Sequence, residues 1–287
     1  LLRIAACAVL GGRAWQFFFA DPPLRSLFWS EKLMTPFATG ILCYEDWHAY
    51  ATDAGMNADI GKFGLILGII LLCGAAAAAL HRPGRTLTRW GILAGGAVLA
   101  FVSVLYYLES NFELAQLLEY SLQTGTPFFL LAAVSRQEFS RRLIWVMSIA
   151  TAVTFICHGL YAGGYGYPRP VSFTTMVMLG FGIESETAAF RFLTVAAWGD
   201  FLAAAFLLLL PYPRVRNIGL VYTIIWGFLT ALARVWSFWM ISDLATILLQ
   251  YTHEWVLRWP HFLVPLVLYV CVPKSTTNYP SPTKVTP

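Results

Sequence analysis

Five charged residues interrupt the long apolar runs of this chain, and they are the first candidates for chemistry. They are Arg13, Glu119, Arg191, Asp200 and Arg234. Placing a charge at the centre of a bilayer costs at least about 2.5–3.5 kcal/mol, so groups of this kind either pair with one another or face water. We therefore ask which of them meet, and what they meet.

If the basic loops face the cytoplasm, the direction of each span places all five residues at the middle of the membrane or in its outer half. His158 and His261 fall at similar outer depths, and Glu109 ends the third apolar run on the same side. These positions predict a polar cavity that opens outward. Its expected lining is Glu109, Glu119, His158, Arg191, Asp200, Arg234 and His261.

Such a cavity could exchange protons and polarise a carbonyl oxygen. The candidate catalytic residues are His158, His261, Asp200, Arg234 and Glu109. The candidate cofactor-binding residues are His158, His261, Arg191 and Glu119. The set does not identify a cofactor. It is compatible with a quinone, which needs little more than a histidine or tyrosine donor and an apolar slot.

Other interpretations of the same residues stay open. Arginine–carboxylate pairs often only hold membrane helices together, and Arg234 could pair in this way with Asp200 or Glu119. His158 and His261 could also ligate a haem between facing helices, which is the less favoured option. We expect no metal site, because His253 and His261 are separated by a spacing that no standard metal motif uses.

Several classes of protein are excluded by what the sequence lacks. It contains no P-loop, no GxSxG and no HExxH motif, and none of its five cysteines forms a CxxC pair. No lysine lies inside an apolar run, which disfavours a Schiff-base photoreceptor. There is no long basic run either, so we expect no nucleic-acid partner.

The composition predicts a membrane protein. Of the 287 residues, 58% are hydrophobic and only 12% are charged, about half the charged fraction of a soluble domain. The apolar runs are continuous, which predicts helices rather than strands. Eight spans are expected, and basic and acidic loops alternate strictly between them. Because basic loops stay in the cytoplasm, both termini should be cytoplasmic. The expected spans are 1–20, 62–80, 90–108, 113–134, 143–162, 188–210, 217–237 and 260–273.

The connections are long on the outer side and short on the inner side. Residues 21–61 should carry a helix from Leu24 to Phe37 that lies in the outer interface, and residues 238–259 a short amphipathic helix. Residues 163–187 open with a rigid, turn-rich stretch, and Ser185 is a candidate N-cap for the helix that follows. We expect one transmembrane domain over 1–274 and a disordered tail over 275–287. The segments Trp90-Gly91-Ile92-Leu93 and Trp226-Gly227-Phe228-Leu229 are similar. This weak similarity points to an internal duplication, with residues 1–134 and 143–273 as the two copies.

The chain resembles DoxX-like and HTTM-type membrane proteins in several short motifs. The motifs are Leu2-Arg3-Ile4 with Gly11-Gly12 and Trp15-Gln16, His158-Gly159-Leu160-Tyr161-Ala162, Gly199-Asp200-Phe201, Trp226 to Arg234, and Arg258-Trp259-Pro260-His261. The resemblance implies a helical bundle and, for some members, a role beside quinone-linked sulfur or thiol oxidation. It also implies a carboxylase with a catalytic lysine in one branch, but Lys32 and Lys62 match no motif of that branch.

Three functional hypotheses follow. The favoured one is an accessory or anchoring subunit of a larger membrane complex, linked to redox or quinone chemistry. The alternatives are an outward-facing quinone-dependent enzyme and a proton-coupled transporter of small solutes, in which Asp200 and Arg234 would act as a switchable pair. In each case we expect a multi-pass protein of the bacterial inner membrane, surrounded by lipid and with its protein partners on the outer face.

Overall fold

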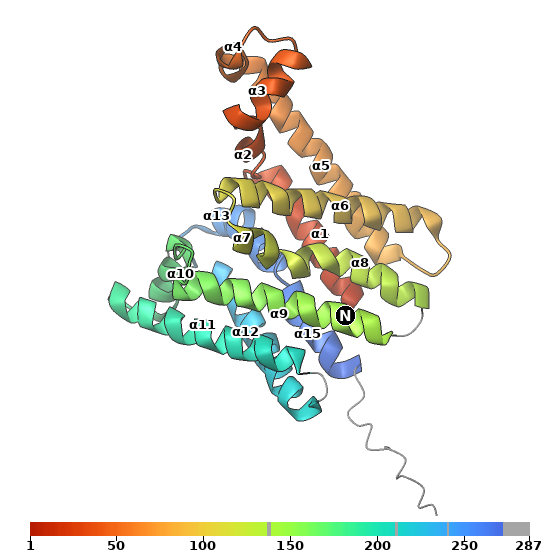
Figure 1. Ribbon diagram of the computed structural model, residues 1–287, viewed down its shortest axis with the longest axis vertical. Coiled ribbons are helices and arrows are strands. Elements are labelled where there is room, and N and C mark those ends of the chain that lie inside the picture. Colours follow the sequence, from red (N-terminus) through yellow and green to blue (C-terminus); the bar gives the residue numbers. More distant parts are fainter. Residues whose placement is uncertain (137–138, 210–211, 240, 272–287) are drawn as a thin grey trace, which may run out of the picture.

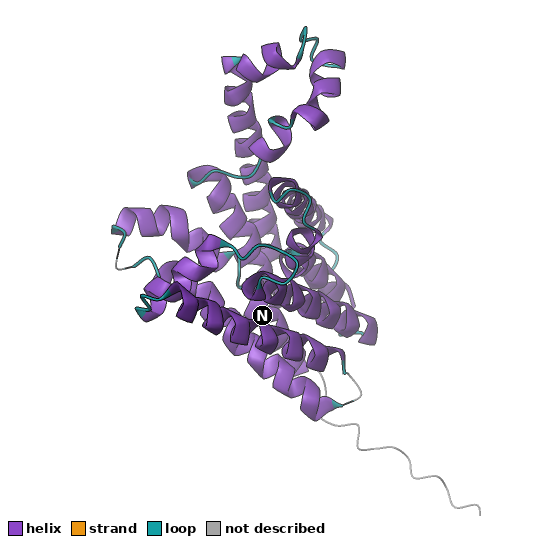
Figure 2. Ribbon diagram, turned by 60° about the vertical axis from the view of Figure 1, so that its left-hand side comes forward, coloured by secondary structure: helices purple, strands orange, loops and turns teal. Residues whose placement is uncertain are grey.

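The chain folds into a bundle of helices. The computed structural model describes residues 1–136, 139–209, 212–239 and 241–271, and within these ranges it contains helices and turns but no strand (Figures 1 and 2). The expected all-α class is therefore confirmed. The expected disordered tail, 275–287, lies outside the described residues.

Eight main helices occupy the eight ranges that the sequence predicts as spans. They are α1 (Leu2–Phe19), α5 (Ala54–Leu80), α6 (Thr86–Glu109), α8 (Ser121–Arg136), α9 (Arg141–Gly163), α11 (Glu186–Leu208), α12 (Pro213–Trp236) and α15 (Pro260–Cys271). Five of them, α5, α6, α9, α11 and α12, are long and apolar enough to cross a membrane. The total of eight spans stays a prediction.

The helices that have the length of a span also carry apolar side chains on their outer surfaces. On α5, Leu65, Ile66 and Leu72 are exposed, and on α11 the same is true of Val195 and Leu202. Exposed aliphatic faces of this kind are costly in water and favourable in hydrocarbon. The bundle therefore has the surface of a protein that is surrounded by lipid.

Short helices fill the long connections. They are α2 (Arg25–Phe28), α3 (Glu31–Gly40), α4 (Trp47–Thr52), α7 (Leu114–Glu119), α10 (Val171–Phe181), α13 (Leu244–Thr246), the π-helix η1 (Ile247–Tyr251) and α14 (Thr252–Val256). The run 113–134, expected as one span, is divided into α7 and α8. The break falls at Tyr120, and next to it the Ser121 hydroxyl donates to the Leu118 carbonyl in place of a continuing helical bond.

Local sequence signals explain where several helices begin and end. Ser185 accepts a hydrogen bond from the Ala188 N–H and caps α11, as its position predicts, and Ser140 caps α9 in the same way. α9 ends at Gly164, which adopts a left-handed conformation (φ +71°) that glycine tolerates best. These caps fix the ends of the two helices that form one wall of the candidate site.

Two glycines let helices approach closely around that site. A Cβ atom at Gly159 of α9 would lie 3.0 Å from the Ala197 carbonyl oxygen of α11. One at Gly227 of α12 would lie 2.6 Å from the His261 carbonyl oxygen of α15. Both positions need glycine, because a larger residue would push the helices apart. The close contacts bring His158, Asp200 and His261 into one region.

The two ends of the bundle differ. The start of α1, the turn after α5 and the end of α8 lie at one end, where the Arg3 guanidinium donates to the His81 carbonyl (Figure 1). At the other end, α2–α4 and the beginning of α5 stand away from the bundle, as both views show (Figures 1 and 2). We call α2–α4 with this part of α5 the extension. Cys43 lies exposed between α3 and α4 within it.

Candidate functional site

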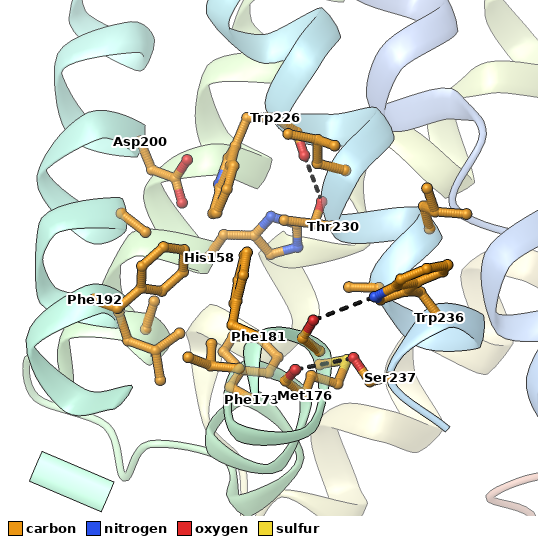
Figure 3. A pocket seen from close by; sticks show the side chains of 18 residues that line it. His158, Phe173, Met176, Phe181, Phe192, Asp200, Trp226, Thr230, Trp236 and Ser237 are labelled. Carbon is orange, nitrogen blue, oxygen red and sulfur yellow. Dashed lines mark hydrogen bonds between the residues drawn. The ribbon is translucent and has the colours of Figure 1, made fainter. Parts of the chain in front are cut away.

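A pocket of about 450 Å³ lies between α9, α10, α11 and α12 (Figure 3). Its walls are mostly aromatic and aliphatic side chains. The aromatic ones are Phe173, Phe181, Phe192, Trp226 and Trp236. The polar side chains on its walls are His158, Asp200, Thr230 and Ser237. The expected cavity is therefore much less polar than the sequence suggests, with a few polar groups in an apolar slot.

His158 of α9 lies on the pocket wall and contacts a carboxylate behind it. Its Nε2 lies 2.9 Å from Oε1 of Glu119 at the end of α7, and both side chains are nearly buried. Since a carboxylate oxygen only accepts, Nε2 carries the proton of this hydrogen bond. Glu119 therefore orients the ring and fixes the tautomer in which Nε2 carries the hydrogen.

His261 of α15 stacks on the other side of His158. The ring centroids are 5.3 Å apart and the planes differ by 10°. The Nδ1 atom of His261 lies 2.9 Å from the Arg258 carbonyl, and Nε2 is buried without a hydrogen-bond partner in the described part of the chain. The rings face each other, so their nitrogens do not point at a shared centre as two axial ligands on one iron would. This geometry does not support the haem hypothesis.

Asp200 of α11 is the second titratable group on the pocket wall, and it is only 2% exposed. The Tyr222 hydroxyl of α12 donates to its Oδ1 at 3.1 Å. Figure 3 shows the carboxyl across the pocket from His158, with Trp226 near both. A carboxyl in such an apolar setting is costly to leave without a partner, and one hydroxyl is the partner that the described residues provide.

The predicted pairing of Arg234 with Asp200 does not form. Among the described residues, Arg234 makes no ion pair and no hydrogen bond, and its Nε is buried without a partner. The guanidinium lies instead over the ring of Phe173, at 5.4 Å from the centroid. The physical reason is direction: Arg234 lies behind the wall that Phe173 contributes, whereas Asp200 faces the pocket.

The structure adds two charged groups near this site that the sequence analysis did not select. Arg258 and Glu254 form a largely buried ion pair, and Glu254 also lies 3.5 Å from the Nε2 of His253. Their spacing of four residues is the helical spacing for such a pair. That spacing could have identified them, but their position in a connection between apolar runs concealed their burial.

Two of the predicted site residues lie elsewhere. Glu109 at the end of α6 and Arg191 near the start of α11 are exposed, and neither lines the pocket. Of the seven residues expected to line the cavity, His158 and Asp200 do so. Glu119 and His261 contact His158 without lining the pocket, and Arg234 does not line it either. Among the described residues, no group of three or more His, Cys, Asp or Glu side chains could hold a metal ion.

Comparison with the known protein families, with curated proteins and with solved structures finds no match for this chain. The resemblance to DoxX-like and HTTM-type proteins therefore stays a prediction from short motifs. Any function must be argued from the pocket itself.

Proposed function

We propose that this chain is a quinone-binding subunit of a redox complex in a bacterial cytoplasmic membrane, with eight spans and both termini inside. One observation carries the proposal. An apolar pocket formed by four helices has on its wall a histidine, His158, whose other side contacts the Glu119 carboxylate at 2.9 Å.

The walls of the pocket suit a flat ring with an isoprenoid chain. Phe192 and Trp226 offer aromatic surfaces, and aromatic rings prefer offset or edge contacts with another ring. Phe181, Leu229 and Trp236 line the pocket and are also largely exposed. The mouth of the pocket is thus apolar on its outside as well, so a ligand dissolved in lipid could enter from the membrane without crossing water.

The polar groups suit the carbonyl oxygens of a quinone. A quinone accepts two electrons and two protons when it is reduced. With a proton on each ring nitrogen, His158 donates to Glu119 through Nε2 and to a ligand oxygen through Nδ1. After Nδ1 has given its proton to that oxygen, the neutral ring keeps its hydrogen bond to Glu119. Asp200 on the opposite wall would supply a second proton at the other end of the ring.

The electrons must come from a redox partner protein, and the extension favours that part of the proposal. Ile41 is 67% exposed, and Leu33, Phe37 and Leu42 near it on the extension are exposed too. A group of apolar side chains raised above the bundle is typical of a surface that another chain covers. This observation favours a subunit over a self-sufficient enzyme.

Photolabelling with an azido-quinone tests the binding site. Ala196 lines the pocket, whereas its neighbour Val195 is 73% exposed on the outer face of α11. We expect Ala196→Phe to fill the pocket and reduce labelling of the α9–α12 peptides at least tenfold. Val195→Phe adds the same ring on the lipid side and should leave the labelling unchanged.

Excess unlabelled quinone should compete with the probe in the wild-type protein. Equal labelling of both variants, or labelling that excess quinone does not reduce, would exclude the pocket as a quinone site. Copurification of partner chains from native membranes tests the subunit part separately. A protein that binds quinone but always purifies alone would be an enzyme or a carrier rather than a subunit.

A further inference from the structure

A second cavity, of about 210 Å³, lies at the opposite end of the bundle, where α5, α6 and α8 meet. Its lining includes His81 after α5, Arg85, Thr86 and Arg89 at the start of α6, and Ser135 near the end of α8. These residues are polar or basic, in contrast to the apolar lining of the first pocket. The proposed binding and reduction of a quinone do not involve this second cavity.

The buried histidine of the cavity has one ring nitrogen that no side chain of the described residues engages. His81 is only 4% exposed, and its Nδ1 lies 2.8 Å from the Thr88 hydroxyl oxygen. That hydroxyl donates its own hydrogen to the Arg85 carbonyl, so it must accept from Nδ1. The remaining nitrogen, Nε2, has no hydrogen-bond partner in the part of the chain that is described. Because Nδ1 already carries a hydrogen, Nε2 donates only when the ring is protonated, and a bound anion stabilises that form.

The charge around the cavity is positive, and the described residues provide no acidic counterpart to it. Arg85 and Arg89 line it, and Arg3 of α1 reaches its edge through the His81 carbonyl. No acidic side chain of the described residues lies within ion-pair distance of these arginines. Burial, together with the charges of Arg3 and Arg89, lowers the pKa of His81. An anion bound here would relieve that repulsion.

The backbone at the start of α6 also favours an anion in the cavity. α6 begins at Thr86, and its N-cap residue, Arg85, provides no side-chain acceptor for the first N–H groups. Free N–H groups at a helix start favour an oxyanion, and the positive end of the helix dipole adds to the attraction. The cavity thus combines a buried imidazole, two guanidinium groups and a helix start from separate segments.

We propose that this cavity binds a phosphate group. Phosphate presents several acceptor oxygens and negative charge, which match two arginines and a histidine that becomes protonated when the anion binds. Two sources offer this chemistry. One is the phosphodiester of an anionic lipid such as phosphatidylglycerol, since the cavity lies at the end of membrane-length helices. The other is free inorganic phosphate from the aqueous side.

A double variant tests the site in the whole protein. Arg85→Gln with Arg89→Gln removes two charges from the cavity, and both side chains are exposed enough to change without disturbing the core. The control is Arg142→Gln with Arg214→Gln, which removes two exposed arginines outside the cavity. A third variant, Arg85→Lys with Arg89→Lys, keeps the charge but loses the two-pronged geometry.

Lipid retention and thermal stability distinguish the two sources. The purified proteins are washed in a neutral detergent, and the phosphatidylglycerol that stays bound is measured by mass spectrometry. Melting temperatures are then compared with and without added inorganic phosphate. For a lipid site, we expect the Gln double variant to retain at least fivefold less lipid than the wild type, the control to retain as much, and the Lys variant to be intermediate.

A phosphate-dependent rise in melting temperature without retained lipid would identify free phosphate as the ligand, provided that the rise is lost in the Gln double variant. The proposal is overturned if the Gln double variant and its control lose the same amount of bound lipid. It is also overturned if the two proteins differ neither in retained lipid nor in the phosphate-dependent rise in melting temperature. Normal elution of the Gln variant on size exclusion shows that any loss comes from the site and not from unfolding.

Discussion

Arg13 and Arg234 are both guanidinium groups inside apolar helices, but their surroundings differ completely. Arg13 donates to Gln16, to Tyr106 and to Gln123, and it lies against the rings of Tyr106 and Tyr120. Among the described residues, Arg234 has the ring of Phe173 and no hydrogen bond. Both arginines occupy similar contexts in the sequence.

The difference separates two uses of charge in a membrane. A network with several hydrogen bonds, like that of Arg13, fixes the helices α1, α6 and α8 relative to one another. A buried arginine with an unpaired N–H donor, like Arg234, adds little to stability, and its donor stays available to a ligand or a partner. The two halves of the bundle differ in the same way. The hydrogen-bonded Arg13 network lies in the first half, whereas the pocket and the Asp200 carboxyl lie in the second, between α9 and α12.

The largest expected effect is a loss of stability when a substitution breaks the Arg13 network. Arg13→Met leaves the buried amide oxygens of Gln16 and Gln123 without their donor, so we expect a loss of unfolding free energy on the order of 3 kcal/mol. Arg234→Met should cost less than about 1 kcal/mol, because it removes only a cation–π contact. Thermal unfolding in detergent measures both. Equal losses would show that the two arginines play the same role.

A smaller effect is expected on ligand affinity when the charge behind His158 is removed. Glu119→Gln keeps a hydrogen-bond acceptor but not the negative charge, so the quinone should bind about tenfold more weakly, which corresponds to about 1.4 kcal/mol. Glu113→Gln is the matched control, because Glu113 accepts from Tyr161 at 2.8 Å, away from the pocket. Titration with a short-chain quinone gives both affinities. A control as weak as the variant would contradict the role given to Glu119.

The next effect concerns the retention of the ligand by α10. Ser237 donates to the Met176 carbonyl at 2.9 Å, and the Trp236 indole donates to the Gly180 carbonyl at 3.2 Å. Ser237→Ala removes one of these two ties between α12 and α10. One neutral hydrogen bond is worth about 1 kcal/mol, so the quinone should dissociate about fivefold faster. Stopped-flow displacement measures this rate, and an unchanged rate would mean that α10 does not control release.

The smallest effect lies in the extension, where a matched polar pair is open to water. The Tyr44 hydroxyl donates to the Asp53 carboxylate and, with the Gly55 N–H, lowers the pKa of Asp53. The stabilisation is present above the ordinary pKa of the carboxyl and is lost as the pH falls through the lowered value. Tyr44→Phe should therefore melt slightly earlier at neutral pH and like the wild type in acid. A difference that persists in acid would assign the effect to packing.

The sequence predicts the fold well because its signals are local and repeated. Continuous apolar runs separated by charged loops locate all eight main helices, and Ser185 caps α11 where its spacing predicts. The break at Tyr120 was missed, because no glycine or proline marks it.

The site was predicted only in part, because direction and distance depend on which helices pack together. The depth of Glu119 and His158 could be read from the spans, but the contact between them requires α7 to lie beside α9. Arg234 and Asp200 have opposite charges, yet the Arg234 guanidinium lies over the Phe173 ring while Asp200 accepts from Tyr222. The missed pair, Glu254 and Arg258, lies in a connection whose burial only the packed bundle reveals.

The extension also gives the protein a natural reporter. Cys43 is its single exposed thiol away from the bundle, within the residues described, whereas Cys73 and Cys271 belong to membrane-length or apolar helices and Cys157 is buried. A charged maleimide cannot cross lipid, so its reaction with Cys43 in intact cells depends only on which compartment holds the extension. The chain thus carries, without any engineering, the chemical label that can decide its orientation in the membrane.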